Sequence, residues 1–357
     1  MLKGSKITLP DGSVENIELL KLGDMVLTAD GKEKPITDIT AFISNLINIK
    51  ISNSVPINLT KGQLIYCGKN NSLDSNDRRA LANNKFKCDY IKSQHITNKT
   101  ILFVPNINKV VASDITPNKA RILGLYAAEG CLNKKTVVFS FGSHEKDNLV
   151  KFCKELIEEE YKCKCFVNIS PSQPTKCSLY VTNKLLFDDC KLYVSSYSQH
   201  KKLNKKIVFG SNEVKLNFIT GWLEGDGSVD KYSGKIIGTT ASKNLAHQIR
   251  LMLNSLYISN SFYINKPSSS IINDRKITGN FDVYRIKISY NNATLFFNLS
   301  DKLKFVNKIK PRKPVSFIGN YRILPILKTC NIKEKHMLYK LTIQDNDSFI
   351  CNGIVIR

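Results

Sequence analysis

Acidic residues are scarce in this chain. Its 357 residues include 53 lysines and arginines but only 30 aspartates and glutamates, which gives a formal net charge of +23. A basic excess of this size favours a polyanionic partner, with nucleic acid ahead of an acidic membrane. The alternative is a basic solvated surface without a ligand, because AT-rich coding would also produce many Asn and Lys residues.

Paired cysteines and long apolar runs are absent as well. The ten cysteines form no CxxC pair, and the nearest two, Cys163 and Cys165, alternate with lysine. This spacing indicates neither a zinc knuckle nor a disulfide framework, so we expect a reducing compartment. The opening MLKGSKITLPDG has no apolar signal core, and no apolar run reaches the length of a bilayer span. We therefore expect no membrane partner and an intracellular location, the nucleus in a eukaryote.

Both ends of the chain have the pattern of short β-strands. Residues 1 to about 107 alternate apolar and polar positions in SKITL, NIELLKL, DMVLTA and TILFVP, with Asp-Gly turns between them. A polar segment, 68–84, predicts an exposed loop. The tail LYKLTIQDNDSFICNGIVIR alternates again, with an Asn-Gly turn at 352–353. We infer one β domain that is interrupted by a second domain, and the length also favours two domains.

The interrupting segment contains a repeated order of elements. A helix, a strand, a helix and two strands follow one another from about residue 117 and again from about residue 213. Matched positions in different elements keep nearly the same offset, which predicts an internal duplication with repeats at about 117–210 and 213–314. The matched pairs are 97, 96 and 96 positions apart: Glu129 and Asp226, Leu149 and Leu245, and Phe166 and Phe262.

Each repeat opens with an apolar helix that ends on an acid, in ARILGLYAAEGCL and in FITGWLEGDGSVD. Small residues four positions apart give each helix a stripe along which another backbone can approach closely. The two stripes therefore predict that the helices pack on each other, although core packing is the ordinary explanation for one such helix alone. The small residues are Gly124, Ala128, Gly221 and Gly225.

The acids Glu129 and Asp226 would then lie at two adjacent helix C-termini. The glycines that follow them, Gly130 and Gly227, suit a left-handed cap. Both helix ends already carry partial negative charge, so two carboxylates there require a cation. Oxygen ligands in small number suit Mg²⁺, with Mn²⁺ as a substitute, and such an ion can activate water beside a scissile phosphate.

LGLYAAEG and TGWLEGDG resemble the two motifs of the LAGLIDADG homing endonucleases, and the doubled αββαββα order is similar to the single-chain members of that family. The resemblance implies a monomer with pseudo-two-fold symmetry whose motif helices form the interface between the halves. It implies that Glu129 and Asp226 bind the catalytic metals. It also implies a double-stranded DNA partner with a long, asymmetric recognition site, lying against two antiparallel sheets. The first motif ends in Glu, where Asp is commoner in the family.

Intein-type members also place a lysine three residues before a proline-like turn after each half. By this resemblance Lys205, in NKKIV, and Lys308, in NKIKP, are candidate catalytic residues. Each would orient water or stabilise charge on the phosphate. In a chain this rich in lysine, a solvated side chain is the alternative for both.

The β-rich ends resemble an intein, or Hint, domain: KGSKITLPDGSVENIELLKLGDMVLTADGK is similar to its first block, and the tail 339–357 to its last blocks. The two resemblances together imply an α+β fold. In it an all-β Hint-like domain, 1–111 and 315–357, is interrupted by an endonuclease domain, 112–314. The residues of splicing chemistry do not carry over, and a thioether cannot attack a peptide carbonyl. Four reactive positions are replaced, by Met1, Gln63, Asp347 and Arg357.

We therefore expect a metal-dependent, site-specific DNA endonuclease with a splicing-inactive Hint domain. Two alternatives stay open: a catalytically dead, maturase-like protein that binds DNA or RNA, and an intein altered so that splicing is blocked. Retention of both acids favours the endonuclease. The replaced reactive positions argue against active splicing.

Overall fold

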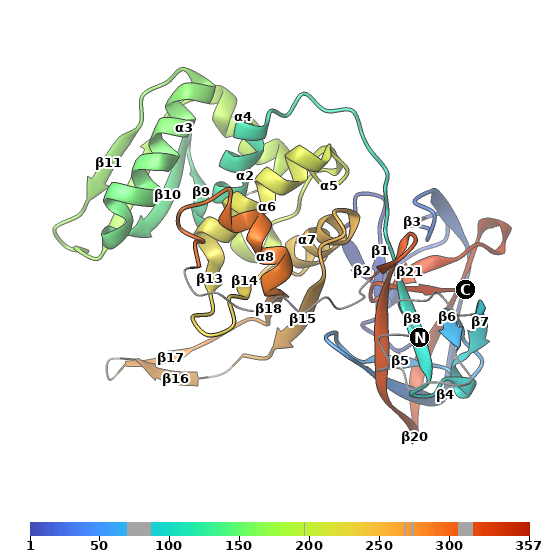
Figure 1. Cartoon of the computed structure of the whole chain (residues 1–357). Helices are drawn as coiled ribbons and strands as arrows, with labels where there is room; N and C mark the ends of the chain where they lie inside the picture. The colour runs from blue at the N-terminus through green and yellow to red at the C-terminus, as the bar shows by residue number, and fades with distance from the viewer. Residues whose placement is uncertain (70–86, 196, 268, 273–274, 306–316) are drawn as a thin grey trace. The chain divides into compact units, whose positions relative to one another are not determined.

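The computed structural model describes residues 1–69, 87–195, 197–267, 269–272, 275–305 and 317–357. The chain divides into two compact units (Figure 1). The first, called the β unit, contains Met1–Lys109, Leu253–Tyr263 and Arg312–Arg357. The second, called the α/β unit, contains Val110–Met252 and Ile264–Pro311. The fold is therefore of mixed α and β type, and the predicted polar loop at 68–84 lies almost wholly outside the described residues.

Strands from both ends of the chain share one sheet in the β unit. Its order is β2-β1-β21-β22-β6-β8-β20-β4-β3, with β5, β7 and β19 attached to β4, β6 and β20. Ile7 of β1 lies opposite Cys351 of β21, and Ile65 of β6 lies opposite Ile356 of β22. The strands are β1 (Lys6–Thr8), β2 (Val14–Asn16), β3 (Met25–Leu27), β4 (Glu33–Ile51), β5 (Ile57–Leu59), β6 (Leu64–Lys69), β7 (Lys87–Lys92), β8 (Thr100–Pro105), β19 (Phe317–Ile318), β20 (Tyr321–Ile343), β21 (Phe349–Cys351) and β22 (Ile354–Ile356).

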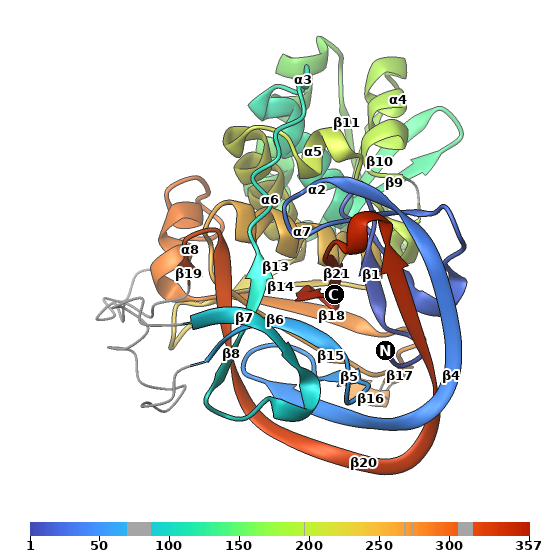
Figure 2. The ribbon, with the colours of Figure 1, turned by 90° about the vertical axis from the view of Figure 1, so that its right-hand side faces the viewer.

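Two strands of the β unit are much longer than the sequence pattern predicts. β4 has 19 residues and β20 has 23, and they run side by side as a curved antiparallel ribbon (Figure 2). Register shifts interrupt their pairing at three places, which lets the ribbon bend. Alternate side chains from the ribbon enter a core rich in isoleucine, so the ribbon and the short strands enclose a common interior.

Local predictions for the β unit are mixed. The Asn-Gly turn is confirmed, because Asn352 and Gly353 have φ angles of 51° and 84° and join β21 to β22. The strand predicted in NIELLKL is wrong beyond Asn16, where a 3-10 turn, Ile17–Leu19, replaces it. Leu19 and Leu22 face solvent there, so the apolar alternation that suggested a strand does not reflect burial.

Two successive sets of helices and strands follow between residues 117 and 297; they belong to the α/β unit except for Leu253–Tyr263, which clusters with the β unit. The first is α2 (Pro117–Glu129), β9 (Gly130–Asn133), β10 (Thr136–Gly142), α3 (Lys151–Tyr161), β11 (Phe166–Ile169), β12 (Lys176–Val181), α4 (Lys184–Tyr193) and α5 (Lys205–Val208). The second is α6 (Asn212–Asp226), β13 (Gly227–Val229), β14 (Ile236–Thr240), α7 (Lys243–Ser255), β15 (Asn260–Asn265), the hairpin β16 (Ser269–Ile272) and β17 (Arg275–Thr278), β18 (Val283–Ile288) and α8 (Tyr290–Phe297).

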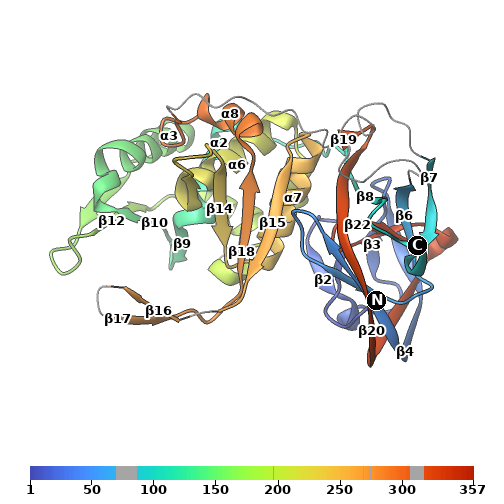
Figure 3. The ribbon, with the colours of Figure 1, turned by 60° about the horizontal axis from the view of Figure 1, so that its bottom comes forward.

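The strands of the two sets form two antiparallel sheets, with orders β11-β12-β10-β9 and β13-β14-β18-β15 (Figure 3). Each set therefore follows the predicted succession of helices and strands, while the origin of both from one duplicated unit stays a prediction. All ten cysteines are free thiols. In the part of the chain that is described, every helix is too short or too polar to cross a bilayer.

Candidate active site at two helix ends

Helices α2 and α6 pack together through their glycine stripes. Each begins with a side-chain cap, since Thr116 accepts a hydrogen bond from the Lys119 N–H and Ser211 accepts one from the Val214 N–H. A methyl group added at Gly124 would lie 2.1 Å from the Phe218 carbonyl oxygen. The close approach that the spacing predicts is therefore present, and it requires glycine.

The packing continues to the C-terminal ends of both helices. A Cβ atom at Gly221 would lie 2.2 Å from the Arg121 carbonyl oxygen, and one at Gly225 would lie 2.3 Å from the Ala128 Cβ. The same added Cβ atom at Gly225 would lie 3.4 Å from the Glu129 Oε1. The residue before Asp226 thus contacts the terminal acid of α2, and the two candidate acids come from adjacent helix ends.

The predicted left-handed caps are wrong. Gly130 has φ −93° and ψ 148°, and Gly227 has φ −100° and ψ 151°, so both are extended. Each is the first residue of a strand, β9 or β13, because the chain passes directly from helix to sheet. Glycine is needed here for space rather than for positive φ. An added Cβ would lie 2.1 Å from the Tyr126 ring at Gly130, and 2.1 Å from the Leu223 carbonyl oxygen at Gly227.

Both terminal acids have a raised pKa. Burial raises the pKa of Glu129 to about 7, and repulsion from the Asp226 and Glu145 carboxylates adds to the effect. Burial also raises the pKa of Asp226 to about 6, against the attraction of Lys201. For both half-buried acids burial outweighs the attraction of nearby lysines, so the ionised forms stay disfavoured, a condition that a divalent cation would relieve.

Lys201 holds the end of α2 from inside. It is 3% exposed, and its Nζ donates to the carbonyl oxygens of Tyr126, Ala127 and Gly130 at 3.0, 2.9 and 3.0 Å. Burial lowers the pKa of this lysine, whereas attraction to Asp226 raises it. The ammonium therefore satisfies helix-end carbonyls and supplies positive charge to both acids, as expected for a cation at a helix C-terminus.

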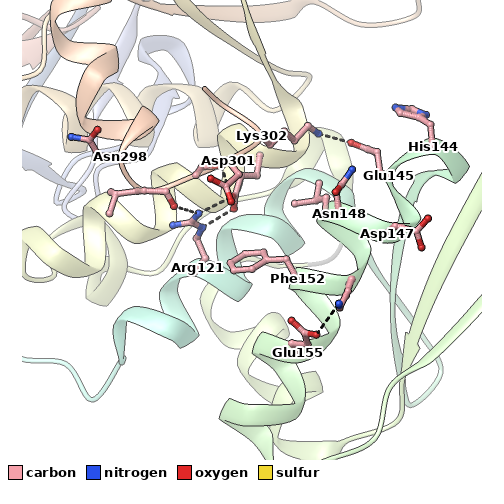
Figure 4. A pocket seen from close by; sticks show the side chains of 15 residues that line it. Arg121, His144, Glu145, Asp147, Asn148, Phe152, Glu155, Asn298, Asp301 and Lys302 are labelled. Atoms are coloured by element: carbon pink, nitrogen blue, oxygen red, sulfur yellow. Dashed lines mark hydrogen bonds and ion pairs between the residues drawn. The ribbon is translucent and has the colours of Figure 1, made fainter. Parts of the chain in front are cut away.

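A second lysine approaches the acids from the other set of elements. Lys302, which follows α8, donates to the Glu145 carboxylate at 2.6 Å (Figure 4). It lowers the pKa of both Glu129 and Asp226 by its charge. Glu145 also accepts a hydrogen bond from the Gly142 N–H. This ion pair borders a cavity of about 770 Å³ that Arg121 and Phe152 also line.

A buried charge network joins α2 to α6 beside that cavity. Arg121 donates from Nε and from Nη2 to the two carboxylate oxygens of Glu224, both at 2.6 Å, and also to the Leu299 carbonyl at 2.8 Å. The Ser300 hydroxyl donates to Glu224 at 2.6 Å. Figure 4 shows the Arg121 side chain pointing toward the segment that contains Asp301. The network fixes the rotation of α6 two residues before its terminal acid.

Of the two lysines predicted from the family resemblance, only Lys205 lies within the described residues. Lys205 is the first residue of α5 and its side chain is exposed. Lys308 lies outside the described residues. Sequence spacing missed Lys201 and Lys302, since no local pattern distinguishes them from the other lysines of this chain.

The two terminal acids could bind a divalent ion that takes its remaining ligands from water and from a substrate. Two carboxylates, Glu129 and Asp226, are available, while within the described ranges no group of three or more His, Cys, Asp or Glu side chains is placed to hold a metal. An ion bound by these two acids would keep open positions for water and phosphate oxygens, a coordination that suits Mg²⁺.

Three of the positions that the intein resemblance marks as replaced, Gln63, Asp347 and Arg357, line one cavity of the β unit, of about 510 Å³. The Gln63 amide donates to the Arg357 carbonyl oxygen at 2.8 Å, and Asp347 pairs with Lys34 at 3.1 Å. Met1 is buried, and its amino group donates to the Tyr339 carbonyl oxygen at 2.7 Å. At the four replaced positions the side chains are a thioether, an amide, a carboxylate and a guanidinium, none of which is a hydroxyl or a thiol.

Residues 213–310, from α6 onward, match the family model described as a LAGLIDADG-like domain. Among curated proteins, the chain is 24% identical over 276 residues to the ATP-dependent DNA helicase Hel308 of Thermococcus kodakarensis, covering 74% of this chain and 24% of the helicase. It is 20% identical to an iron-sulfur cluster assembly SufBD family protein of Mycobacterium tuberculosis, covering 99% of this chain and 42% of that protein. It is 24% identical to a DNA polymerase of Methanocaldococcus jannaschii, covering 99% and 22%. The chain thus spans less than half the length of these relatives.

Among solved structures, the homing endonuclease I-DmoI in complex with DNA and calcium is similar at 19% identity and a TM-score of 0.37, covering 53% of this chain and 91% of that one. I-DmoI is also solved with Mg and with Mn. The homing endonuclease I-WcaI bound to its DNA recognition sequence is similar at 11% identity and a TM-score of 0.32, covering 55% and 90%.

Proposed function

We propose that this chain is a site-specific endonuclease that cuts double-stranded DNA with divalent metal held by Glu129 and Asp226. The observation that carries the proposal is the pairing of two half-buried helix ends, each bearing a carboxylate whose pKa is raised toward neutrality. The LAGLIDADG-like match over residues 213–310 supports this class. The net charge of +23 suits a polyanionic duplex.

The chain's own groups would divide the work as follows. A bound Mg²⁺ or Mn²⁺ would supply an activated water and neutralise charge at the scissile phosphate. Lys201 keeps the end of α2, and with it Glu129, in position through its three carbonyl contacts. Lys302 can leave Glu145 and offer its ammonium to a phosphate oxygen. Lys205 and Lys308 stay candidates for the same role in their own halves.

We also propose that the β unit is a Hint-type domain without splicing activity. A helicase, an iron-sulfur assembly protein and a DNA polymerase are named for unrelated activities. The matches to the assembly protein and to the polymerase each cover 99% of this chain but only 42% and 22% of those proteins, respectively. A segment shared by such different proteins is what a self-contained inserted element would produce. The Gln63 amide cannot exchange a proton as a histidine would, so the acid-base step of splicing has no group at this position.

One experiment separates this function from its alternatives. The protein is incubated with Mg²⁺ and a randomised duplex library, and the ends of cut and bound molecules are sequenced. The proposal expects double-strand breaks at one discrete, asymmetric site. Duplex or RNA binding without any cut would instead favour a maturase-like binding protein. A ligated product from a version with fused flanking polypeptides would show active splicing and refute the inert β unit.

A further inference from the structure

A second cavity of the β unit, of about 870 Å³, has no part in the proposed cleavage. Its lining comes from three places in the chain: the turn between β3 and β4, the segment that follows β8, and the start of β20. All of the lining residues belong to the β unit. Sites for small molecules usually have volumes of roughly 300–1,000 Å³, so this cavity has room for a small organic ligand.

One buried side chain in this lining lacks hydrogen-bond partners. Asn106 directly follows β8 and is 5% exposed, and its backbone N–H donates to the Asn320 carbonyl oxygen at 2.8 Å. Among the described residues, neither the nitrogen nor the oxygen of its side-chain amide has a partner. Burial of both atoms without hydrogen bonds destabilises the fold. The amide is therefore complementary to a ligand that brings one donor and one acceptor, side by side.

The rest of the lining favours a flat, uncharged group. Each of its three lysines is paired with an acid: Lys32 with Asp30, Lys34 with Asp345 and Lys109 with Glu33, at 2.8, 3.0 and 2.6 Å. A phosphate at this place would have to compete with those carboxylates. Tyr321 brings an aromatic ring to the same lining, and such a ring is a platform on which a planar ligand can stack. The lining thus combines an amide with a ring, which is the combination that recognises a nucleobase.

We propose that this cavity binds an adenine base, which belongs either to a free nucleotide or to an unpaired nucleotide of a nucleic acid. Adenine carries its N6 amino group between two ring acceptors, N1 and N7, so two of its edges offer a donor beside an acceptor. Asparagine binds such an edge with both amide atoms. Because these atoms are covered, the Asn106 side chain turns toward the cavity as the base enters, and the base stacks on Tyr321. This site does not depend on the proposed endonuclease function.

Two binding measurements with the full chain test the site and identify the source of the base. In the first, equilibrium dialysis compares adenosine monophosphate with inosine monophosphate, which has an oxygen in place of the N6 amino group, and with uridine monophosphate. In the second, a duplex with one unpaired adenine is compared with the same duplex carrying an abasic site. We expect a preference for adenine of about tenfold or more in at least one measurement. A preference in the first shows a free nucleotide as the source, and a preference in the second alone shows a nucleic acid.

Variants of Asn106 assign the preference to this cavity. Asn106→Leu removes both amide atoms and should abolish the preference for adenine without lowering stability, because it replaces an amide that lacks partners. Asn106→Asp keeps an acceptor but loses the donor, and it should abolish the preference as well. Asn98→Leu, at an exposed residue before β8, is the matched control and should keep it.

Circular dichroism and urea unfolding show whether each variant is folded. Absence of any preference for adenine in both measurements would refute this inference, and so would a full preference in either folded Asn106 variant. Failure of both Asn106 variants to fold would show that the amide is needed inside the fold, which also refutes it. Cleavage of DNA is measured separately, so failure of this inference leaves the proposed function untouched.

Discussion

Replacing Asp226 by Asn should stabilise the free protein while it abolishes cleavage. Burial raises the pKa of Asp226 from its ordinary 3.8 to about 6. A shift of about two units means that the fold disfavours the ionised carboxylate by on the order of 3 kcal/mol at neutral pH. Asparagine has nearly the same shape and no charge, so Asp226→Asn should raise the free energy of unfolding at pH 7.5 by about 1–3 kcal/mol.

The pH dependence of this effect has a definite sign. Because the folded pKa of Asp226 lies above the unfolded one, the unfolded chain loses its proton first as the pH rises. The wild-type protein should therefore lose stability between about pH 4 and pH 6 through Asp226, and between about pH 4.5 and pH 7 through Glu129. Below pH 4 the wild type and Asp226→Asn should be equally stable. The gap between them should open as the pH rises and level off above about pH 6.

Urea unfolding in EDTA, followed by tryptophan fluorescence from pH 4 to pH 8, measures this difference. The chain has one tryptophan, Trp222, which is buried in α6, so the signal reports on the α/β unit. Asp188→Asn, at an exposed acid of α4, makes the same charge change and should have no comparable effect. Adding Mg²⁺ should stabilise the wild type but not Asp226→Asn. An Asp226→Asn variant that is less stable than the wild type in EDTA at pH 7.5 would refute the reasoning.

Three further predictions concern the contacts that hold the two helix ends. Arg121→Met should lower the free energy of unfolding by about 3–5 kcal/mol, because it leaves Glu224 buried without its charged partner. The double variant Arg121→Met, Glu224→Leu should be within about 1–2 kcal/mol of the wild type. Urea unfolding of both variants checks this. Gly221→Ala should lower the free energy of unfolding by at least about 1–3 kcal/mol, because its methyl group would overlap the Arg121 carbonyl. Thermal unfolding should show this as a lower midpoint temperature. Lys201→Met should destabilise the protein by on the order of 3 kcal/mol, because three buried carbonyl oxygens lose their donor. Lys205→Met is the control and should leave stability unchanged. Equal effects of the two variants would contradict the assigned contacts.

The sequence predicts those features that depend on local spacing. The glycine stripe at Gly221 and Gly225 could be predicted because residues four apart share one helix face, and such a stripe needs a partner of the same kind. The terminal acids follow from the same spacing, since they come directly after the stripe. The Asn-Gly hairpin at 352–353 could be predicted because few residues accept its positive φ angles.

Other features depend on contacts between distant residues, and no local pattern predicts them. Arg121 and Glu224 are 103 positions apart, and Lys201 meets the Gly130 carbonyl across 71 positions. The conformation of Gly130 was predicted wrongly because a glycine after a helix usually serves as a left-handed cap, whereas here the next strand begins at once. The length of β20 was missed because Pro325 and three register shifts interrupt its alternation.

Cleavage of the selected duplex by matched acid variants tests the central claim most directly. The wild type and Asp188→Asn are compared with Glu129→Gln and Asp226→Asn, with Mg²⁺ present and DNA affinity measured in parallel. The wild type and Asp188→Asn should cut both strands at the selected site. Glu129→Gln and Asp226→Asn should bind the same duplex with affinity within several-fold of the wild type, because phosphate contacts elsewhere dominate affinity, and should make no double-strand cut. Full double-strand cleavage by Asp226→Asn would contradict the assignment of the active site to the ends of α2 and α6.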